Sequence, residues 1–236
     1  MSKLVSQRRA RRALIASIAI TLALYFVPFG GFLSYPLVLL STLAHELAHG
    51  LMAVLVGGKF EAFELYSDGS GVARWSGRPS RLSLAMVAGA GLIGPAIAAW
   101  MCFVLAKRAR LSRLSMVVFG TLLIAAMVLV IRNAFGWVFV GSVAAVSMAI
   151  GLKASRETAQ LSLVFVGTQL ALSVFSRSDY LFTSVAQTAN GPMPSDTQQI
   201  ANALIGPYWL WGMVAGLISL SVLWFGLRSF LKGAAD

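Results

Sequence analysis

Two histidines four residues apart carry the clearest chemical signal in the sequence. They lie in the segment His45-Glu46-Leu47-Ala48-His49, and the chain of 236 residues has no other histidine. On a helix, residues i and i+4 project from one face a turn apart, so both imidazoles can reach one metal ion. The spacing therefore predicts a zinc site, with one Zn²⁺ per chain held by His45 and His49.

Glu46, beside the first histidine, has the chemistry of a general base. Zinc lowers the pKa of a coordinated water to about 7, so a nearby carboxylate can take its proton and later give it to a leaving amine. Patterns this short also recur by chance, and a His or Glu can simply bond a neighbouring helix. The apolar helical context and the use of every histidine in the chain favour metal chemistry.

Two histidines and a water leave a tetrahedral zinc ion one protein ligand short. There is no third histidine, and Cys102 lies in an apolar run, so a carboxylate is expected. Asp179, directly after an apolar run, is the favoured ligand. Asp196 is the alternative, because helix capping also explains an acid at that position. Asn133 is a further candidate, as a weak oxygen ligand, as an oxyanion or substrate contact, or as the donor of an interhelical hydrogen bond.

The composition indicates that the elements positioning these residues lie in a membrane. Hydrophobic residues make up 58% of the chain and charged residues 11%. A soluble domain carries roughly 25% charged residues, so most of this chain must face lipid. We expect one membrane-embedded domain over residues 1–236. Its fold class is all-α and polytopic, with about six or seven transmembrane helices and a small β-hairpin after the histidine helix.

Apolar runs of membrane-spanning length follow one another along the chain. A basic head precedes the first run but no small-residue cleavage site follows it, so we expect a retained span and not a cleaved signal peptide. Gly57-Gly58 should end the histidine helix, and residues 67–71 should form the hairpin turn. The expected spans are 13–29, 36–56, 82–106, 114–131, 135–152, 158–175 and 207–227, with the hairpin at 59–75 and a polar loop at 176–206.

The formal net charge of +11 reflects 19 basic against 8 acidic residues. The basic residues cluster at the ends of apolar runs, where cations meet lipid headgroups and set topology. The expected partner is therefore the lipid bilayer and not nucleic acid. If each run crosses once, the basic loop 107–113 falls on the outer side, against the rule that basic loops stay inside. The sequence alone leaves the orientation open.

Several segments accompany the histidine pentad in a familiar order. They are 41–50 around the pentad, the Gly57-Gly58 break, the turn 66–71, the small-residue run 88–95, the segment Arg132-Asn133-Ala134-Phe135-Gly136, and Ser195-Asp196. Together they resemble the site-2 protease family of intramembrane zinc metallopeptidases, in particular a short, compact branch from bacteria and plants. The family's usual third ligand lies in a Leu-Asp-Gly motif, which this sequence lacks.

The resemblance implies hydrolysis of peptide bonds within or beside the bilayer, with a transmembrane protein as substrate and a hairpin that helps to present it unwound. The favoured function is thus a zinc-dependent intramembrane endopeptidase, a multi-pass protein of a bacterial inner or plasma membrane. The missing Leu-Asp-Gly motif motivates a catalytically idle homologue that binds membrane proteins. Broken helices with polar residues motivate a small transporter, although the chain has no repeated half.

Overall fold

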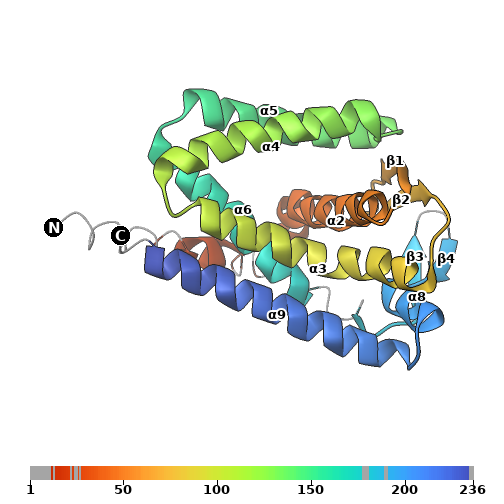
Figure 1. Cartoon of the computed structure of the whole chain (residues 1–236). Coiled ribbons are helices and arrows are strands. Elements are labelled where there is room, and N and C mark those ends of the chain that lie inside the picture. The colour runs from red at the N-terminus through yellow and green to blue at the C-terminus, as the bar shows by residue number, and fades with distance from the viewer. Residues whose placement is uncertain are drawn as a thin grey trace.

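The computed structural model of the chain describes residues 12, 14–21, 23, 26, 28–176, 181–188 and 191–233. Long helices dominate, and two small antiparallel sheets lie at one end of the molecule (Figure 1). The elements, in chain order, are α2 (Gly30–Leu55), β1 (Lys59–Leu65), β2 (Gly71–Ser76), α3 (Arg81–Leu105), α4 (Ala109–Leu129), α5 (Ala134–Lys153), α6 (Arg156–Ser176), β3 (Val185–Thr188), β4 (Gly191–Pro194), α8 (Asp196–Ala203) and α9 (Tyr208–Gly233).

Among the described residues, six helices are long and apolar enough to cross a membrane, namely α2, α3, α4, α5, α6 and α9. Large apolar side chains such as Leu122 and Leu217 point outwards on them, as expected where the solvent is lipid. These helices and the small hairpins confirm the predicted fold class. The expected first span, 13–29, is only partly described, and its residues 14–21 are helical.

The histidine helix α2 is longer than the sequence suggests. The apolar run predicts a start at Pro36, but the helix begins at Gly30 and Pro36 lies inside it. An unpaired backbone group is costly in lipid, so the uncharged residues before the proline join the helix and do not form a loop. The helix ends at Leu55 as predicted, and Gly57 follows with a φ of 85°, which glycine adopts without steric penalty.

The first hairpin, β1–β2, packs into the helical core. Its register places Phe63 opposite Ala73. Phe63 and Leu65 are fully buried in the same apolar cluster as residues of α2, α3 and α6. On its other side, β1 bonds to the backbone of residues 130–132. The hairpin is thus held by the membrane helices on which it was expected to lean.

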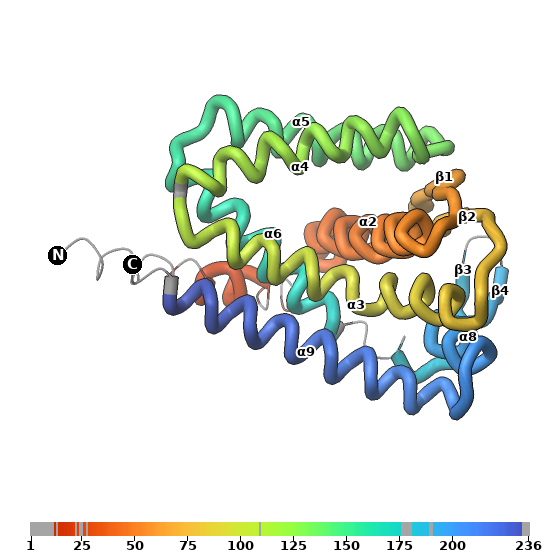
Figure 2. Tube along the Cα trace, viewed as in Figure 1, coloured from red at the N-terminus to blue at the C-terminus, as the bar shows by residue number. Residues whose placement is uncertain are grey.

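The region expected as a polar loop, 176–206, contains a second hairpin, β3–β4, and the helix α8. The helix begins where the sequence predicts, at Ser195-Asp196. The sequence does not predict this hairpin, because β4 has the sequence Gly-Pro-Met-Pro and prolines are unusual in β-strands. Ile200 and Ala203 of α8 pack against α3 and α9, which holds this segment beside the first hairpin (Figure 2).

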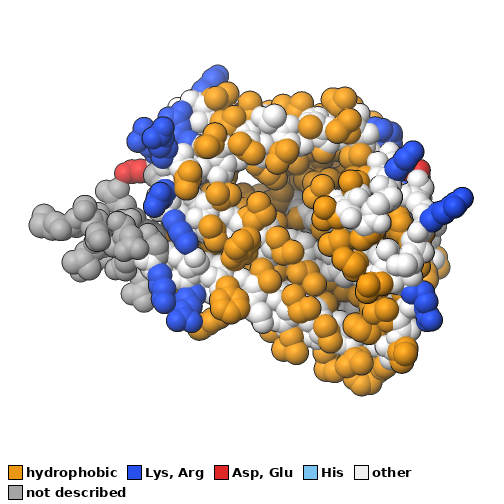
Figure 3. Space-filling view, viewed as in Figure 1, with side chains coloured by type: hydrophobic (Ala, Val, Ile, Leu, Met, Phe, Trp, Pro, Cys, Tyr) orange, Lys and Arg blue, Asp and Glu red, His pale blue; other side chains and the backbone are white. Residues whose placement is uncertain are grey.

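Basic side chains lie at both ends of the molecule, with more of the described ones at the end opposite the hairpins, whereas Lys59, Arg74, Arg78, Arg81 and Arg132 lie at the hairpin end (Figure 3). Consecutive membrane helices alternate in direction, so the α3–α4 turn, the α5–α6 turn and the end of α9 share the end opposite the hairpins (Figure 1). The loop 107–113 therefore lies with the other basic turns, the grouping that the positive-inside rule favours. The basic residues at this end are Lys107, Arg108, Arg110, Arg113, Lys153, Arg156, Arg228 and Lys232.

Candidate metal centre

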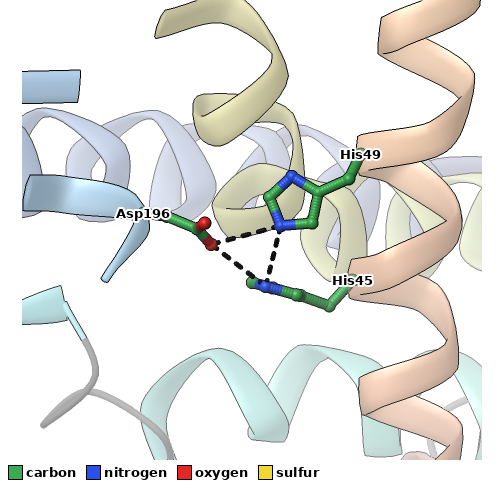
Figure 4. Close-up of side chains that lie close together, drawn as sticks. All are labelled: His45, His49 and Asp196. Atoms are coloured by element: carbon green, nitrogen blue, oxygen red, sulfur yellow. Dashed lines mark hydrogen bonds and ion pairs between the residues drawn. The ribbon is translucent and has the colours of Figure 1, made fainter. Parts of the chain in front are cut away.

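Three side chains from two distant parts of the chain converge near the hairpins. The Nε2 atoms of His45 and His49 lie 3.1 Å apart, and Oδ2 of Asp196 lies 3.0 Å from the first and 3.3 Å from the second (Figure 4). The histidines project from α2, and the aspartate begins α8. Asp196 is 3% exposed and His49 is 9% exposed, so the cluster is shielded from its surroundings.

The contact between α2 and α3 orients His49. Its Nδ1 lies 2.8 Å from the carbonyl oxygen of Val87, so Nδ1 carries the proton and donates it. This tautomer leaves the lone pair of Nε2 facing the cluster, as a metal ligand requires. Gly91 provides the space for the ring, because a Cβ at that position would overlap the imidazole. A small residue on α3 thus permits the close helix approach that aims the ligand.

The N-terminus of α8 positions Asp196. Ser195 caps this helix: its Oγ accepts a hydrogen bond from the Gln198 N–H at 3.2 Å and donates one to the Thr183 carbonyl at 2.6 Å. The cap fixes the helix start, and the packing of α8 on α3 fixes its distance from α2. The Asp196 carboxylate is therefore aimed by tertiary contacts, whereas the histidine spacing comes from one helix.

The donor set and its spacing fit a zinc ion. Ligand atoms about 2.0–2.1 Å from a tetrahedral zinc ion lie about 3.3 Å from one another, close to the three separations here. Oδ2 of Asp196 is buried and has no hydrogen-bond donor among the described residues. A buried carboxylate oxygen that faces two imidazole nitrogens needs positive charge between them, from protons or from a metal cation. The cluster is thus compatible with a metal site.

Asp196 stays ionised although it is buried. Burial alone would raise the pKa of its carboxyl group, but positive charge on the neighbouring His49 and His45 rings lowers it, and the net pKa then lies below the usual range. The ionised carboxylate is the form that binds a metal.

Glu46 lies on the wall of a cavity next to the cluster. The cavity has a volume of about 90 Å³, and His45 lines it as well. Glu46 is 8% exposed, and its Oε2 accepts a hydrogen bond from the Ala73 N–H at 2.7 Å. A carboxylate beside a metal ligand on the wall of a cavity can receive and return a proton. The hydroxyl-bearing residues of the wall are Ser41, Thr42, Ser70, Ser173, Thr188 and Ser219.

The other candidates named from sequence lie elsewhere. Asp179 belongs to residues 177–180, outside the described part of the chain. Asn133 pairs with the backbone of Leu65: its Oδ1 accepts from the Leu65 N–H at 3.3 Å and its Nδ2 donates to the Leu65 carbonyl at 2.6 Å. In the structure Asn133 thus anchors β1, because residues 130–133 run beside that strand, and it is not among the residues that line the cavity.

Two backbone groups that hold site side chains in place could not be predicted from the sequence. The Val87 carbonyl and the Ala73 N–H are backbone atoms, and no residue type marks them. Gly91 was visible only as part of a small-residue run. The serine before Asp196 was the one available signal, because a capped helix start can aim an acid inwards as well as stabilise the helix.

Comparison with known families agrees with this site. A family model described as Peptidase M50B-like matches residues 15–226. The chain belongs to this family. Neither curated proteins nor solved structures give a match. The matched M50B-like region contains all three residues of the cluster, and membership confirms the resemblance to site-2 proteases.

Membership and the six apolar helices together identify an integral, multi-pass membrane protein from a family of membrane metalloproteases.

Proposed function

We propose that this M50B-like protein is a zinc-dependent intramembrane endopeptidase that cleaves membrane-protein substrates within or beside the bilayer. The convergence of His45, His49 and Asp196 carries the proposal, because their ligand atoms lie within 3.3 Å of one another. Asp196 would take the place that the absent Leu-Asp-Gly motif holds in related enzymes. This weakens the reason for considering a catalytically idle homologue.

Each residue has a separate role in this proposal. A zinc ion held by the three ligands would act as a Lewis acid and make hydroxide available near neutral pH. Glu46 receives the proton of a cavity water and passes it to the leaving amine. The Val87 carbonyl keeps His49 in the tautomer that binds metal. The apolar helices exclude bulk water, which strengthens the electrostatic interactions inside the cavity.

The proposed location is a bacterial inner or plasma membrane, with the eight basic residues of the α3–α4, α5–α6 and α9 ends on the cytoplasmic side. The metal centre then lies nearer the opposite face. A cysteine introduced at Arg110 should react with a membrane-impermeant thiol reagent only after the cells are lysed. Labelling of that cysteine in intact cells would reverse the orientation.

The activity is tested with purified protein in liposomes and a library of single-span test proteins, each with an apolar segment of about 20 residues. Wild type should cleave members of the library, and Glu46→Gln should abolish cleavage while zinc content and thermal stability are retained. Removal of zinc with a chelator should stop cleavage, and added zinc should restore it.

Glu61→Gln is the matched control, since this exposed acid lies on β1 away from the cavity. It should cleave like wild type. A zinc-loaded wild type that cleaves no library member yet forms stable complexes with them would favour the idle homologue. Undiminished cleavage by Glu46→Gln would sink the proposed mechanism.

A further inference from the structure

The outer edge of β1 is paired at Phe63 and Leu65. Phe63 donates its N–H to the Val130 carbonyl at 2.7 Å and accepts from the Arg132 N–H at 3.1 Å. Leu65 forms the equivalent pair with the side-chain amide of Asn133. These bonds use the backbone groups through which an extended peptide would add to this strand. The β1 edge is therefore closed along these residues.

The outer edge of β2 is bonded to α2 at Ala73. Since Phe63 turns its backbone away from β2, its partner Ala73 also points its N–H outwards, where Glu46 accepts it at 2.7 Å. Next to it, a Cβ on Gly71 would lie only 2.8 Å from Thr42 Cγ2. At Gly71 β2 packs closely on α2, and the Ala73 N–H is not free to pair with an added strand. In this conformation the backbone groups of Phe63 and Leu65 and the N–H of Ala73 are therefore already bonded.

In the second hairpin, two prolines decide which backbone groups face outwards. The register pairs Val185 with Pro194 and Gln187 with Pro192. Pairs that exchange two hydrogen bonds need an N–H on both residues, so they can only be Ala186–Met193 and Thr188–Gly191. The residues that point outwards on β4 are therefore the prolines, which offer no donor. On β3 the outward residues are Val185 and Gln187.

Gln187 of β3 lies beside the cavity that His45 and Glu46 line. Gln187 and its neighbours Ala186 and Thr188 line the same cavity as His45 and Glu46. Among the described residues, none bonds to the outward N–H or C=O of Gln187. Two residues after β4 comes Asp196, and Ser195 donates its N–H to the Ser184 carbonyl at 3.0 Å just before β3. The edge is thus tied directly to the third member of the metal cluster.

We propose that β3 is the docking strand for the substrate: an unwound, extended segment pairs its backbone with the N–H and C=O of Gln187. This inference rests on the proposed protease function. A helical segment has no free backbone groups, so only an extended segment can pair in this way. Docking on β3 brings that segment into the cavity lined by His45 and Glu46. The prolines of β4 prevent the competing addition on the other edge.

Replacing Gln187 by proline removes the outward N–H and breaks no bond between β3 and β4, because Gln187 belongs to a pair that exchanges none. In liposomes, with the library member that wild type cleaves fastest, Gln187→Pro should raise KM about tenfold with a much smaller change in kcat. Gln187→Ala keeps the N–H and should raise KM far less. Equal KM values for wild type and Gln187→Pro, at full zinc content, would overturn the docking strand.

A second measurement does not depend on how the proline variant folds. A photo-crosslinking amino acid is placed at Gln187, at Trp75 on β2 or at Met193 on β4 in the inactive Glu46→Gln protein, together with the same test protein. Crosslinks should form predominantly from position 187. Crosslinks from position 75 in place of position 187 would assign docking to the first hairpin and contradict the proposal.

The two proposals fail separately. If Glu46→Gln cleaves normally, the protease mechanism is wrong whatever happens at Gln187. If Glu46→Gln is inactive while position 187 neither changes KM nor crosslinks, the mechanism stands and the docking strand alone is wrong.

Discussion

α2 and the segment 181–206 supply the same candidate metal centre, but they are held in place by different means. In α2 one helical turn sets the spacing of His45 and His49, so local geometry suffices. In the segment 181–206 the elements are short, and Asp196 depends on a helix cap and on the packing of α8 against α3. Half of the site is therefore built locally and half by tertiary contacts, and disturbing each half should have different consequences.

The largest effect is expected where α3 supports the α2 half. In Gly91→Ala the new Cβ overlaps the His49 ring, so the imidazole or the helix must move. We expect a loss of about 1–3 kcal/mol in the free energy of unfolding, together with a fall in zinc content. Unfolding in detergent and metal analysis measure the two. Gly89→Ala is the control, because its Cβ would meet only Ile200 at 3.9 Å. Equal behaviour of both variants would refute the close-approach account of His49.

The next effect concerns the first hairpin, in which the Ala73 N–H donates a hydrogen bond to Glu46. Asn133→Ala removes both hydrogen bonds to the Leu65 backbone and leaves those buried groups unpaired. The free energy of unfolding should fall by about 1–3 kcal/mol, with zinc content unchanged. Ser142→Ala on α5, whose hydroxyl bonds only its own helix, should be near neutral. Zinc loss in Asn133→Ala with normal stability would instead support the ligand role considered from sequence.

A smaller effect is expected at the N-cap of α8, which should influence zinc binding as well as stability, whereas the N-cap of α3 should influence stability alone. Ser195→Ala and Ser80→Ala each remove an N-cap, of α8 and of α3 respectively. Each should cost about 1 kcal/mol of stability. Only Ser195→Ala should also weaken zinc binding, because its cap aims Asp196. Competition with a chromogenic chelator measures the affinity, and equal zinc affinities in the two variants would show that the cap has no part in positioning the ligand.

The smallest effect is a pH dependence at the first hairpin. The Tyr66 hydroxyl and Arg74 hold the pKa of Glu64 below its usual range, and Ser70 does the same for Asp68. Because the folded-state pKa values are depressed, this stabilisation is complete above about pH 5 and is lost as pH falls through the folded values. The melting temperature of Glu64→Gln should approach that of wild type in acid. If the difference in melting temperature between wild type and Glu64→Gln grew as the pH fell, the predicted direction of the pH dependence would be wrong.

The local half of the site is what the sequence could reveal. The pentad identified His45, Glu46 and His49, and apolar run lengths identified the membrane helices, because both signals lie within single elements. The sequence favoured Asp179 over Asp196 as the third ligand. The position of Asp196 beside α2 depends on how the more than 140 residues between them fold, which sequence patterns do not show. The β3–β4 hairpin could not be predicted, because prolines are unusual in strands and the sequence does not show which residues pair with them.

The central claim is that Asp196 completes the zinc site begun by α2. The most direct test is zinc per chain in purified wild type, Asp196→Ala and Asp179→Ala, with Asp68→Ala as an exposed control. We predict one zinc ion per chain in wild type, Asp179→Ala and Asp68→Ala, and a loss of zinc in Asp196→Ala. Full zinc content in Asp196→Ala, with loss in Asp179→Ala, would contradict the account and identify Asp179 as the third ligand.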